Sequence, residues 1–335
     1  MSFTDLIDLA SERLGASVIA ANDEFFAPKE SLVKPGVPEW REGVYTERGK
    51  WMDGWETRRR RTSERDWEVI RRERDWAIVR LGVPGVVHGV VIDTTHFTGN
   101  YPERASIDAL AAEGVPSIEW LTGGQAQWEP LLPETELAGN RANELTVESR
   151  KRVTHVRLNI FPDGGVARLR VHGTAAPDPG VFTPSEVDLA AMENGGFVVE
   201  CSDMHYGHRQ NLILPGRSTH MGDGWETKRR RGPGHEWTIV RLAHRGKIHR
   251  VEIDTDHFRG NSPAALMLEG CDAEVSESFS PDTVTWREIV TDSPVQPHSR
   301  HQFHPRGTTP VTHVRLNIYP DGGIARLRVI GRPSS

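Results

Sequence analysis

Residues 153–173 read VTHVRLNIFPDGGVARLRVHG and residues 311–331 read VTHVRLNIYPDGGIARLRVIG, so 18 of 21 positions are identical. Two more blocks repeat in the same order: DGWETRRRR at 53–61 returns as DGWETKRRR at 223–231, and DTTHFTGN at 93–100 returns as DTDHFRGN at 254–261. Many apolar side chains fill a core equally well, so packing alone does not require the same His, Asn or Arg twice. The shared polar residues therefore indicate a common network of structural bonds or a common site.

The repeat implies two domains. The chain has 335 residues, a length that suits two domains, and the repeat period is far longer than a solenoid unit. We predict a first domain over residues 1–173, a linker over residues 174–182, and a second domain over residues 183–335. The small residues and prolines of GTAAPDPG, which begins at Gly173, are typical of a linker.

Composition restricts the compartment and the partners. The net charge of −6 gives no reason to expect nucleic acid as a partner, and no apolar run is long enough for a membrane span. Cys201 and Cys271 are the only cysteines, which argues against a disulfide framework. The N-terminal residues include acids where a secretory signal would carry bases. We expect a cytoplasmic protein.

Both copies begin with a short predicted helix and continue as β-structure. Residues 5–14 space their apolar side chains as a helix does, and TPSE at 183–186 predicts the N-terminus of the counterpart. AIVRL at 77–81 and VVID at 90–93 predict strands, as do their partners in the second copy. Many short strands with little helix favour a β-sandwich in each copy.

The repeated 21-residue stretch predicts a β-hairpin. Val156, Leu158 and Ile160 alternate with polar residues, and PDGG at 162–165 has the composition of a turn. The opposite face carries His155, Arg157, Asn159 and Arg168, with His313, Arg315, Asn317 and Arg326 in the second copy. We favour a polar face of the sheet that the other domain or another subunit covers, over a site, for these residues.

The DGWET block combines an aromatic side chain, a carboxylate and arginines. We favour a site at Trp55–Glu56 and at Trp225–Glu226, because an arginine beside them presents a planar fork of donors that suits a carboxylate. In an extended segment, only alternate members of the arginine run can face one site. A solvated charged strand that pairs with nearby acids explains the later arginines equally well.

The DTxHF block follows an apolar strand, so it lies at a strand end or in a loop, where catalytic groups are common. Asp254 and His257 are three residues apart and can act as acid and base or as metal ligands. The following glycine fits a tight turn that exposes Asn261. The alternative is a structural turn with a capping aspartate and a buried, bonded histidine. No zinc, P-loop or dinucleotide fingerprint accompanies the block.

Histidines concentrate in the second copy, which holds eleven of the 15. Two clusters stand out, DMHYGH at 203–208 and HSRHQFH at 298–304. If only one copy is catalytic, the second is therefore favoured. His205 and His208 are weak metal-site candidates, because no cysteine or carboxylate set at ligand spacing accompanies them.

The chain resembles the allantoicase (allantoate amidinohydrolase) family. The matching elements are SDMHYGH at 202–208, MGDGWET at 221–227, IDTDHFRGN at 253–261, THVRLNIYPDGG at 312–323 and their first-copy partners, such as NDEFFAPKE at 22–30. The resemblance implies a mostly β protein with two tandem jelly-roll β-sandwich domains of the galactose-binding-like kind. It also implies a homo-oligomer that hydrolyses allantoate to ureidoglycolate and urea in purine (allantoin) breakdown.

The resemblance and the residues together suggest roles. Our hypothesis is Glu226 or Asp254 with His257 as the acid–base set, and Arg229 or Arg231 on the substrate carboxylate. The further catalytic candidates are His205 and His313, and the further substrate-binding candidates are Trp225, Asn261, Glu56, His96 and Asn100. No cofactor is predicted, and a divalent metal such as Mn²⁺ stays open. The alternative from another class is a non-catalytic tandem β-sandwich that binds a ligand.

Overall fold

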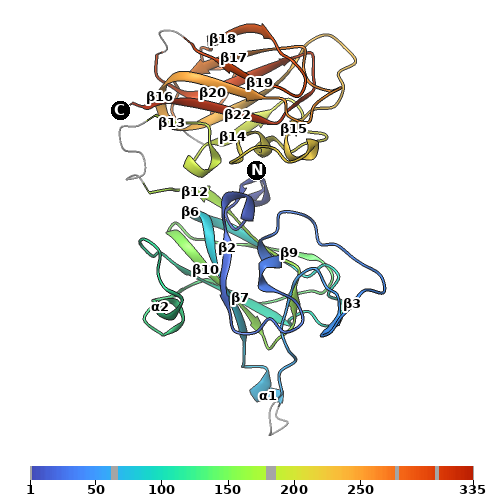
Figure 1. Ribbon diagram of the computed structural model, residues 1–335. Coiled ribbons are helices and arrows are strands. Elements are labelled where there is room, and N and C mark those ends of the chain that lie inside the picture. Colours follow the sequence, from blue (N-terminus) through green and yellow to red (C-terminus); the bar gives the residue numbers. More distant parts are fainter. Residues whose placement is uncertain (1, 62–66, 179–185, 276–278, 306–308, 335) are drawn as a thin grey trace. The chain divides into compact units, whose positions relative to one another are not determined.

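The computed structural model describes residues 2–61, 67–178, 186–275, 279–305 and 309–334. It divides into two compact units, Met1–Ala176 (unit 1) and Pro177–Ser335 (unit 2) (Figure 1). Each unit contains an 8-stranded antiparallel sheet, and strands dominate both. The predicted class, a mostly β protein of two homologous β-sandwich domains, is confirmed.

One long strand organises unit 1. The first part of β6 (Asp75–Asp93) pairs with β2 (Ser17–Ala21) and β10 (Arg152–Phe161), and its last part pairs with β9 (Ala142–Thr146) and β12 (Arg168–Ala175). Three more strands extend these pairings: β7 (Arg104–Leu110) beside β10, β8 (Glu129–Glu136) beside β7, and β1 (Ile7–Asp8) beside β12. The 19-residue β6 thus belongs to both layers of the sandwich.

Unit 2 repeats this topology around β16 (Glu236–Asp254). Its first part pairs with β14 (Phe197–Cys201) and β20 (Val311–Tyr319), and its last part pairs with β19 (Arg300–Phe303) and β22 (Arg326–Pro333). The outer strands are β17 (Ala265–Cys271), β18 (Arg287–Pro294) and β13 (Val187–Asp188). The two units therefore share one strand order.

Short elements complete each unit. The small antiparallel pairs are β5 (Trp55–Glu56) with β11 (Gly165–Val166), β15 (Trp225–Glu226) with β21 (Gly323–Ile324), and β3 (Tyr45–Thr46) with β4 (Gly49–Lys50). The α-helices are α1 (Trp67–Ile70) and α2 (Ile118–Thr122). The 3-10 helices are η1 (Phe3–Asp5), η2 (Glu12–Leu14), η3 (Lys29–Val33), η5 (Met192–Asn194), η6 (Arg209–Ile213) and η7 (Met221–Asp223). None of the described helices has the length and apolar character that a membrane crossing requires.

The leading segment differs from the predicted helix over residues 5–14. The 3-10 helices η1 and η2 flank the two-residue strand β1, which pairs with β12. The middle of this amphipathic stretch therefore pairs with the sheet and does not form a helix. In unit 2 the predicted helix start at residues 183–185 lies outside the described residues, and Val187–Asp188 form a strand.

The predicted hairpin is wrong, although both of its strands exist. β10 and β12 do not pair with each other, because β6 lies between them in the sheet. Between them, β11 pairs with β5 and carries the chain from one layer to the other. The predicted turn is thus a crossing point between layers, and the same holds for β20, β21 and β22.

Candidate functional site

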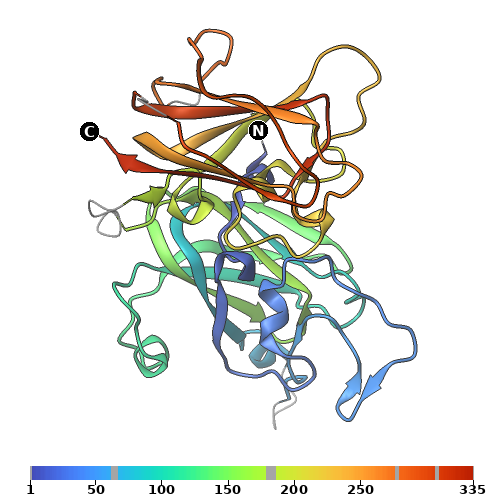
Figure 2. The same ribbon diagram turned by 45° about the horizontal axis from the view of Figure 1, so that its top comes forward.

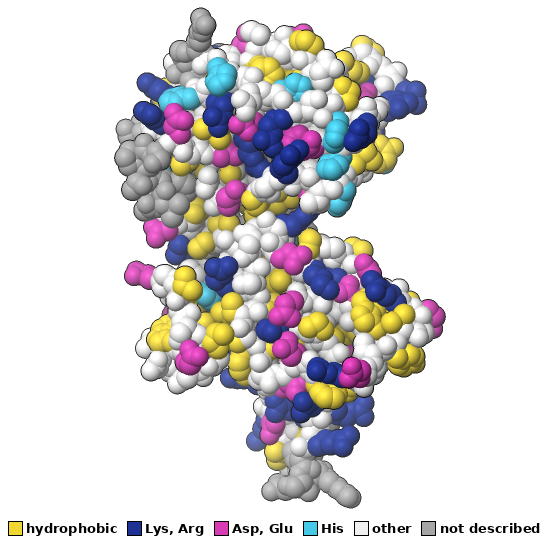
Figure 3. Space-filling view, viewed as in Figure 1, with side chains coloured by type: hydrophobic (Ala, Val, Ile, Leu, Met, Phe, Trp, Pro, Cys, Tyr) yellow, Lys and Arg dark blue, Asp and Glu magenta, His cyan; other side chains and the backbone are white. Residues whose placement is uncertain are grey.

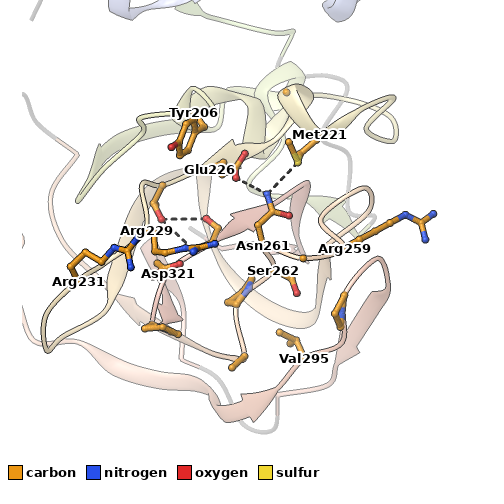
Figure 4. Close-up of a pocket in the computed structure, with 18 residues that line it drawn as sticks. Tyr206, Met221, Glu226, Arg229, Arg231, Arg259, Asn261, Ser262, Val295 and Asp321 are labelled. Atoms are coloured by element: carbon orange, nitrogen blue, oxygen red, sulfur yellow. Dashed lines mark hydrogen bonds between the residues drawn. The ribbon is translucent and has the colours of Figure 1, made fainter.

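A cavity of about 970 Å³ opens in unit 2 (Figure 4). Five segments form it: the loop at residue 206 after β14, residues 221–231, the loop 259–264 after β16, the segment after β18, and the turn between β20 and β21. The side chains that matter below are Tyr206, Met221, Glu226, Arg229, Arg231, Arg259, Asn261 and Asp321. Of the predicted site residues, this cavity brings together Glu226, Arg229, Arg231 and Asn261.

The strand β15 separates Trp225 from Glu226. Successive side chains of a strand point to opposite faces. Trp225 is fully buried in the core and its Nε1 donates to the carbonyl oxygen of Asp203 at 2.8 Å, whereas Glu226 faces the cavity. The predicted substrate contact of Trp225 is therefore wrong. Its role is to anchor the strand that carries Glu226.

Two glycines allow the turn between β20 and β21 to pack closely against the neighbouring wall of the cavity. A Cβ atom on Gly323, opposite Glu226 in β21, would overlap the fully buried ring of Phe258. Gly322 has a φ of +133°, and a Cβ atom there would lie 2.5 Å from the carbonyl oxygen of Asn261. Only glycine accepts such close backbone approach in this conformation. The repeated PDGG sequence thus brings the turn against the loop that carries Asn261.

A carboxylate–amide pair lies in the cavity. Asn261 Nδ2 donates to Glu226 Oε1 at 2.6 Å and also contacts Met221 Sδ at 3.2 Å. Glu226 is 8% exposed, so its carboxylate is nearly enclosed by protein and still borders the cavity. Unit 1 keeps the same bond, with Asn100 Nδ2 2.7 Å from Glu56 Oε1. The glutamate and the asparagine of the two repeated blocks are therefore direct partners.

The arginine run alternates between two roles. Lys228 pairs with Asp203 at 3.3 Å, and Arg230 pairs with Glu236 at 2.9 Å. Arg229 and Arg231 instead line the cavity, together with Arg259. Within the part of the chain that the structure describes, none of these three guanidinium groups forms an ion pair or a hydrogen bond. The cavity therefore presents unpaired positive charge beside the Glu226–Asn261 pair.

Asp254 and His257 lie outside this cavity. Asp254 Oδ1 accepts a hydrogen bond from the Asp256 amide at 2.8 Å and borders a separate cavity of about 300 Å³. Burial raises the pKa of Asp254, and the charge of Asp256 adds to the rise. His257 has a φ of +70°, and its Nε2 lies 3.1 Å from the carbonyl oxygen of Ser218. This is the alternative of a structural turn, with a capping aspartate and a bonded histidine.

The first copy shows the same turn. His96 has a φ of +71°, and its Nε2 lies 3.2 Å from the carbonyl oxygen of Pro38. The repeated histidine therefore holds the loop that precedes η7 in unit 2 and the corresponding loop in unit 1. An acid–base pair of His257 with Glu226 has no support in this placement, because His257 does not border the cavity.

His313 is also distant from the cavity lining. Its ring is 1% exposed, stacks on Phe279 with ring centroids 4.1 Å apart, and lies 2.9 Å from the Thr312 hydroxyl. Burial lowers the pKa of His313 to about 4, and the positive charge of Arg241 adds to the effect. A catalytic role for His313 is therefore not supported. Phe279 covers this part of the polar face from within unit 2, and Arg315 there pairs with Glu269 at 2.7 Å.

His205 lies at the edge of the cavity. Its exposed ring packs edge-on against Tyr206, a cavity residue, with ring centroids 4.5 Å apart. On the face drawn in Figure 3, the histidines gather over unit 2. The described residues contain no group of three or more His, Cys, Asp or Glu side chains that could hold a metal ion. The described side chains thus do not form a manganese site of that kind.

Other repeated polar residues are structural. Arg326 pairs with Asp223 at 3.2 Å, and Arg168 pairs with Asp53 at 2.5 Å, with all four side chains buried. Burying charges in this way is favourable only when they are paired and hydrogen-bonded. The buried ion pair between this arginine and the aspartate of the DGWET block explains why that aspartate is present in both copies.

Among the polar cavity side chains named above, three were not predicted. They are Tyr206, Arg259 and Asp321. Arg259 stands where the first copy has Thr98, one of few differences within a closely repeated block. Such a difference beside a shared asparagine was the signal that could have identified it. Asp321 belongs to the PDGG sequence, which we interpreted only as a turn.

Unit 1 has a smaller cavity at the corresponding place. Its volume is about 230 Å³, and it brings together the predicted residues Glu56, His96 and Asn100. Trp40, Gly49 and Lys50 add walls that have no counterpart in unit 2, because they belong to a longer loop. The two cavities therefore share a carboxylate–amide pair and differ in what surrounds it.

The fold and the two related cavities define a duplicated β-sandwich protein with a related cavity in each copy. Its residues 7–176 and 187–334 match the family model described as allantoicase repeat. A Nocardia farcinica relative named probable allantoicase is 48% identical over 330 residues, which cover 98% of this chain and 95% of the relative. The Dictyostelium discoideum protein named allantoicase is 42% identical over 335 residues, covering 97% of this chain and 87% of that protein.

Solved structures agree with these relatives. The crystal structure of allantoicase from Saccharomyces cerevisiae matches with a TM-score of 0.80 and 36% identity, covering 97% of this chain and 92% of that one. The chain belongs to the allantoicase family. The resemblance drawn from the repeated blocks is thereby confirmed, and with it the expectation of an enzyme of this family.

Proposed function

We propose that the cavity of unit 2 hydrolyses allantoate to ureidoglycolate and urea. Allantoate carries one carboxylate and two ureido groups on a central carbon. The observation that carries the proposal is the position of Arg229 and Arg231, unpaired among the described residues, beside the Glu226–Asn261 pair. The names of the relatives, which match over nearly the whole chain, support the same substrate.

The arginines supply the carboxylate site. A guanidinium group binds a carboxylate through two parallel hydrogen bonds, and this geometry gives both energy and orientation. Arg229 and Arg231 border one side of the cavity, whereas Arg259 extends away from them (Figure 4). We assign Arg229 and Arg231 to the substrate carboxylate, which leaves the ureido groups to the opposite wall.

The carboxylate–amide pair supplies the ureido site. A ureido group offers N–H donors and one carbonyl acceptor, which match a carboxylate oxygen and an amide group. Glu226 uses Oε1 for the bond from Asn261, and Oε2 accepts no hydrogen bond from a described residue. We assign Oε2 to the reacting ureido group or to the water beside it.

Glu226 is the acid–base group of the proposal. It accepts a proton from the water that adds to the central carbon, while the bond from that carbon to one ureido nitrogen breaks. It then returns the proton to this nitrogen, so that urea leaves and the hydroxyl group stays on ureidoglycolate. Acid–base catalysis by one placed group contributes on the order of 10²–10⁴ in rate. We further propose that the reaction serves allantoin breakdown in the cytoplasm, where the two free cysteines stay reduced.

The first test is urea release from allantoate by the purified protein, with and without prior chelation. We expect urea and ureidoglycolate in equal amounts, and the chelator decides whether a divalent metal is required. A folded protein that releases no urea, with or without added Mn²⁺, would contradict the proposal. That result would instead favour the alternative of a non-catalytic tandem module that binds a ligand.

A further inference from the structure

The cavity of unit 1 is shaped by a loop that unit 2 lacks. Fourteen residues separate Pro38 from Asp53, whereas four separate the corresponding Ser218 from Asp223. The longer loop contains the β3–β4 hairpin, which stands out from unit 1 (Figure 2). It also contributes Trp40 and Lys50 to the cavity, which measures about 230 Å³ against about 970 Å³ in unit 2.

Flat side chains form the walls of this small cavity. The rings of Trp40 and His96 lie 5.4 Å apart between centroids, and Phe26 lines the cavity with them. The Lys50 ammonium group lies 3.9 Å from the centre of the Trp40 ring. The face of Trp40 is thus already occupied by a cation, and a second cation in the cavity would meet like charge.

Glu56 is the polar centre of the cavity. Its Oε1 accepts the hydrogen bond from Asn100, and among the described residues Oε2 has no partner. Burial raises the pKa of Glu56, while the bond from Asn100 opposes the rise. A ligand that donates N–H groups to Oε2 would therefore stabilise the ionised carboxylate.

No arginine is among the described residues that line this cavity. Thr98 replaces Arg259, and the cation that lines the cavity is Lys50, whose ammonium group lies over the Trp40 ring. A substrate carboxylate thus loses the guanidinium groups that would bind it. The cavity keeps the carboxylate–amide pair and adds flat apolar walls.

We propose that the cavity of unit 1 is a second ligand site, specific for small uncharged molecules with a ureido group, such as urea and N-alkylureas. The planar ureido group fits between the aromatic walls and donates its N–H groups to Glu56. The choice of a ureido ligand rests in part on the proposed function, in which the same pair in unit 2 binds a ureido group. The site itself lies within unit 1.

The test is ligand-observed NMR of N-methylurea with the full-length protein. We expect saturation transfer to the methyl group, and about tenfold or more weaker binding in Glu56→Gln, because a hydrogen bond to a charged group is lost. Glu226→Gln removes the ureido contact that the proposed function places in unit 2, so Glu56→Gln is compared in this background, where the remaining signal reports unit 1 and is expected to persist. Trp40→Ala, in the loop, is a second variant that should weaken binding while the thermal unfolding of all variants is compared.

Each outcome is decisive. A signal that Glu226→Gln keeps, and that is lost when Glu56→Gln or Trp40→Ala is added to it, supports the site. Absence of binding, loss of the signal in Glu226→Gln alone, a signal that survives the added Glu56→Gln, or equally tight binding of N-methylguanidinium overturns it. Allantoate hydrolysis is measured separately, so a failure of the proposed function in unit 2 and a failure of this site in unit 1 are distinguishable.

Discussion

Glu226 and Asp254 were equal candidates in the sequence, and the structure separates them into different cavities. We expect Glu226→Gln to lower kcat for allantoate by on the order of 10²–10⁴, because it removes the acid–base group and keeps the side-chain shape. Asp254→Asn is the matched comparison, with an expected loss of less than about tenfold once stability is controlled. A larger kcat loss in Asp254→Asn than in Glu226→Gln would reverse the assignment.

The arginine run offers an internal control at adjacent residues. Arg229 faces the cavity, whereas Lys228 pairs with Asp203 on the other side of the segment. We expect Arg229→Ala to raise KM for allantoate about tenfold to a hundredfold, because a hydrogen bond between charged groups is lost. Lys228→Ala should change KM little, since an exposed ion pair contributes little. Equal effects of the two substitutions in steady-state kinetics would argue against the carboxylate site.

At the scale of elements, the turn between β20 and β21 depends on its glycines. Gly323→Ala places a methyl group into the Phe258 ring, and we expect about 1–3 kcal/mol of lost stability from overpacking. Gly260→Ala is the control, because a Cβ atom there meets nothing within 4 Å. Denaturant unfolding of both variants measures the difference. If the two midpoints shift equally, the turn is not packed as described.

The buried His313 on β20 predicts that the stability of the protein depends on pH. The folded pKa of His313 is about 4 and its ordinary value is 6.5, so the unfolded chain binds more protons between these values. The free energy of unfolding therefore falls as pH drops from about 6.5 to 4, by about 1.4 kcal/mol per unit of pKa shift. Asp188, whose pKa burial raises to about 6, contributes in the opposite direction.

His313→Gln isolates this contribution, because the effect of Asp188 is common to variant and wild type and cancels. We expect a smaller slope of stability against pH in the variant, measured by urea unfolding at several pH values. His304→Gln, at an exposed position, should keep the wild-type slope. Unchanged slopes in both variants would show that folding does not shift the pKa of His313.

The elements also show how far the sequence predicts the structure. The repeated blocks located parts of β6, β10 and β12 and of their counterparts in unit 2, and Glu226 and Asn261, both predicted as site residues, line the cavity. They did not predict β6 as one strand, because Gly82, Pro84 and Gly85 have the composition of a strand break. In a strand, successive side chains point to opposite faces, and the sequence does not say which face points to the cavity. The prediction for Trp225 was therefore wrong, because its side chain points into the core. Which strands pair across layers depends on tertiary contacts that no local pattern contains.

At the scale of the whole molecule, both copies keep the hydrogen bond between a glutamate and an asparagine, but the side chains around this bond differ. Both units hold the Glu–Asn pair, but only in unit 2 do arginines line the cavity among the described residues. Unit 1 instead has a longer loop, which narrows its cavity. Two cores of the same topology thus present two different sets of groups to a ligand.

The difference between the two cavities predicts how many allantoate molecules one chain binds. We expect the inactive Glu226→Gln protein to bind one allantoate per chain at concentrations near the wild-type KM, measured by isothermal titration calorimetry. The carboxylate of allantoate needs the guanidinium groups of Arg229 and Arg231, and unit 1 offers none in its described cavity lining. Adding Arg229→Ala and Arg231→Ala to this variant should remove the heat of binding. Two equivalent sites per chain, or binding that survives the triple substitution, would mean that unit 1 also recognises the carboxylate.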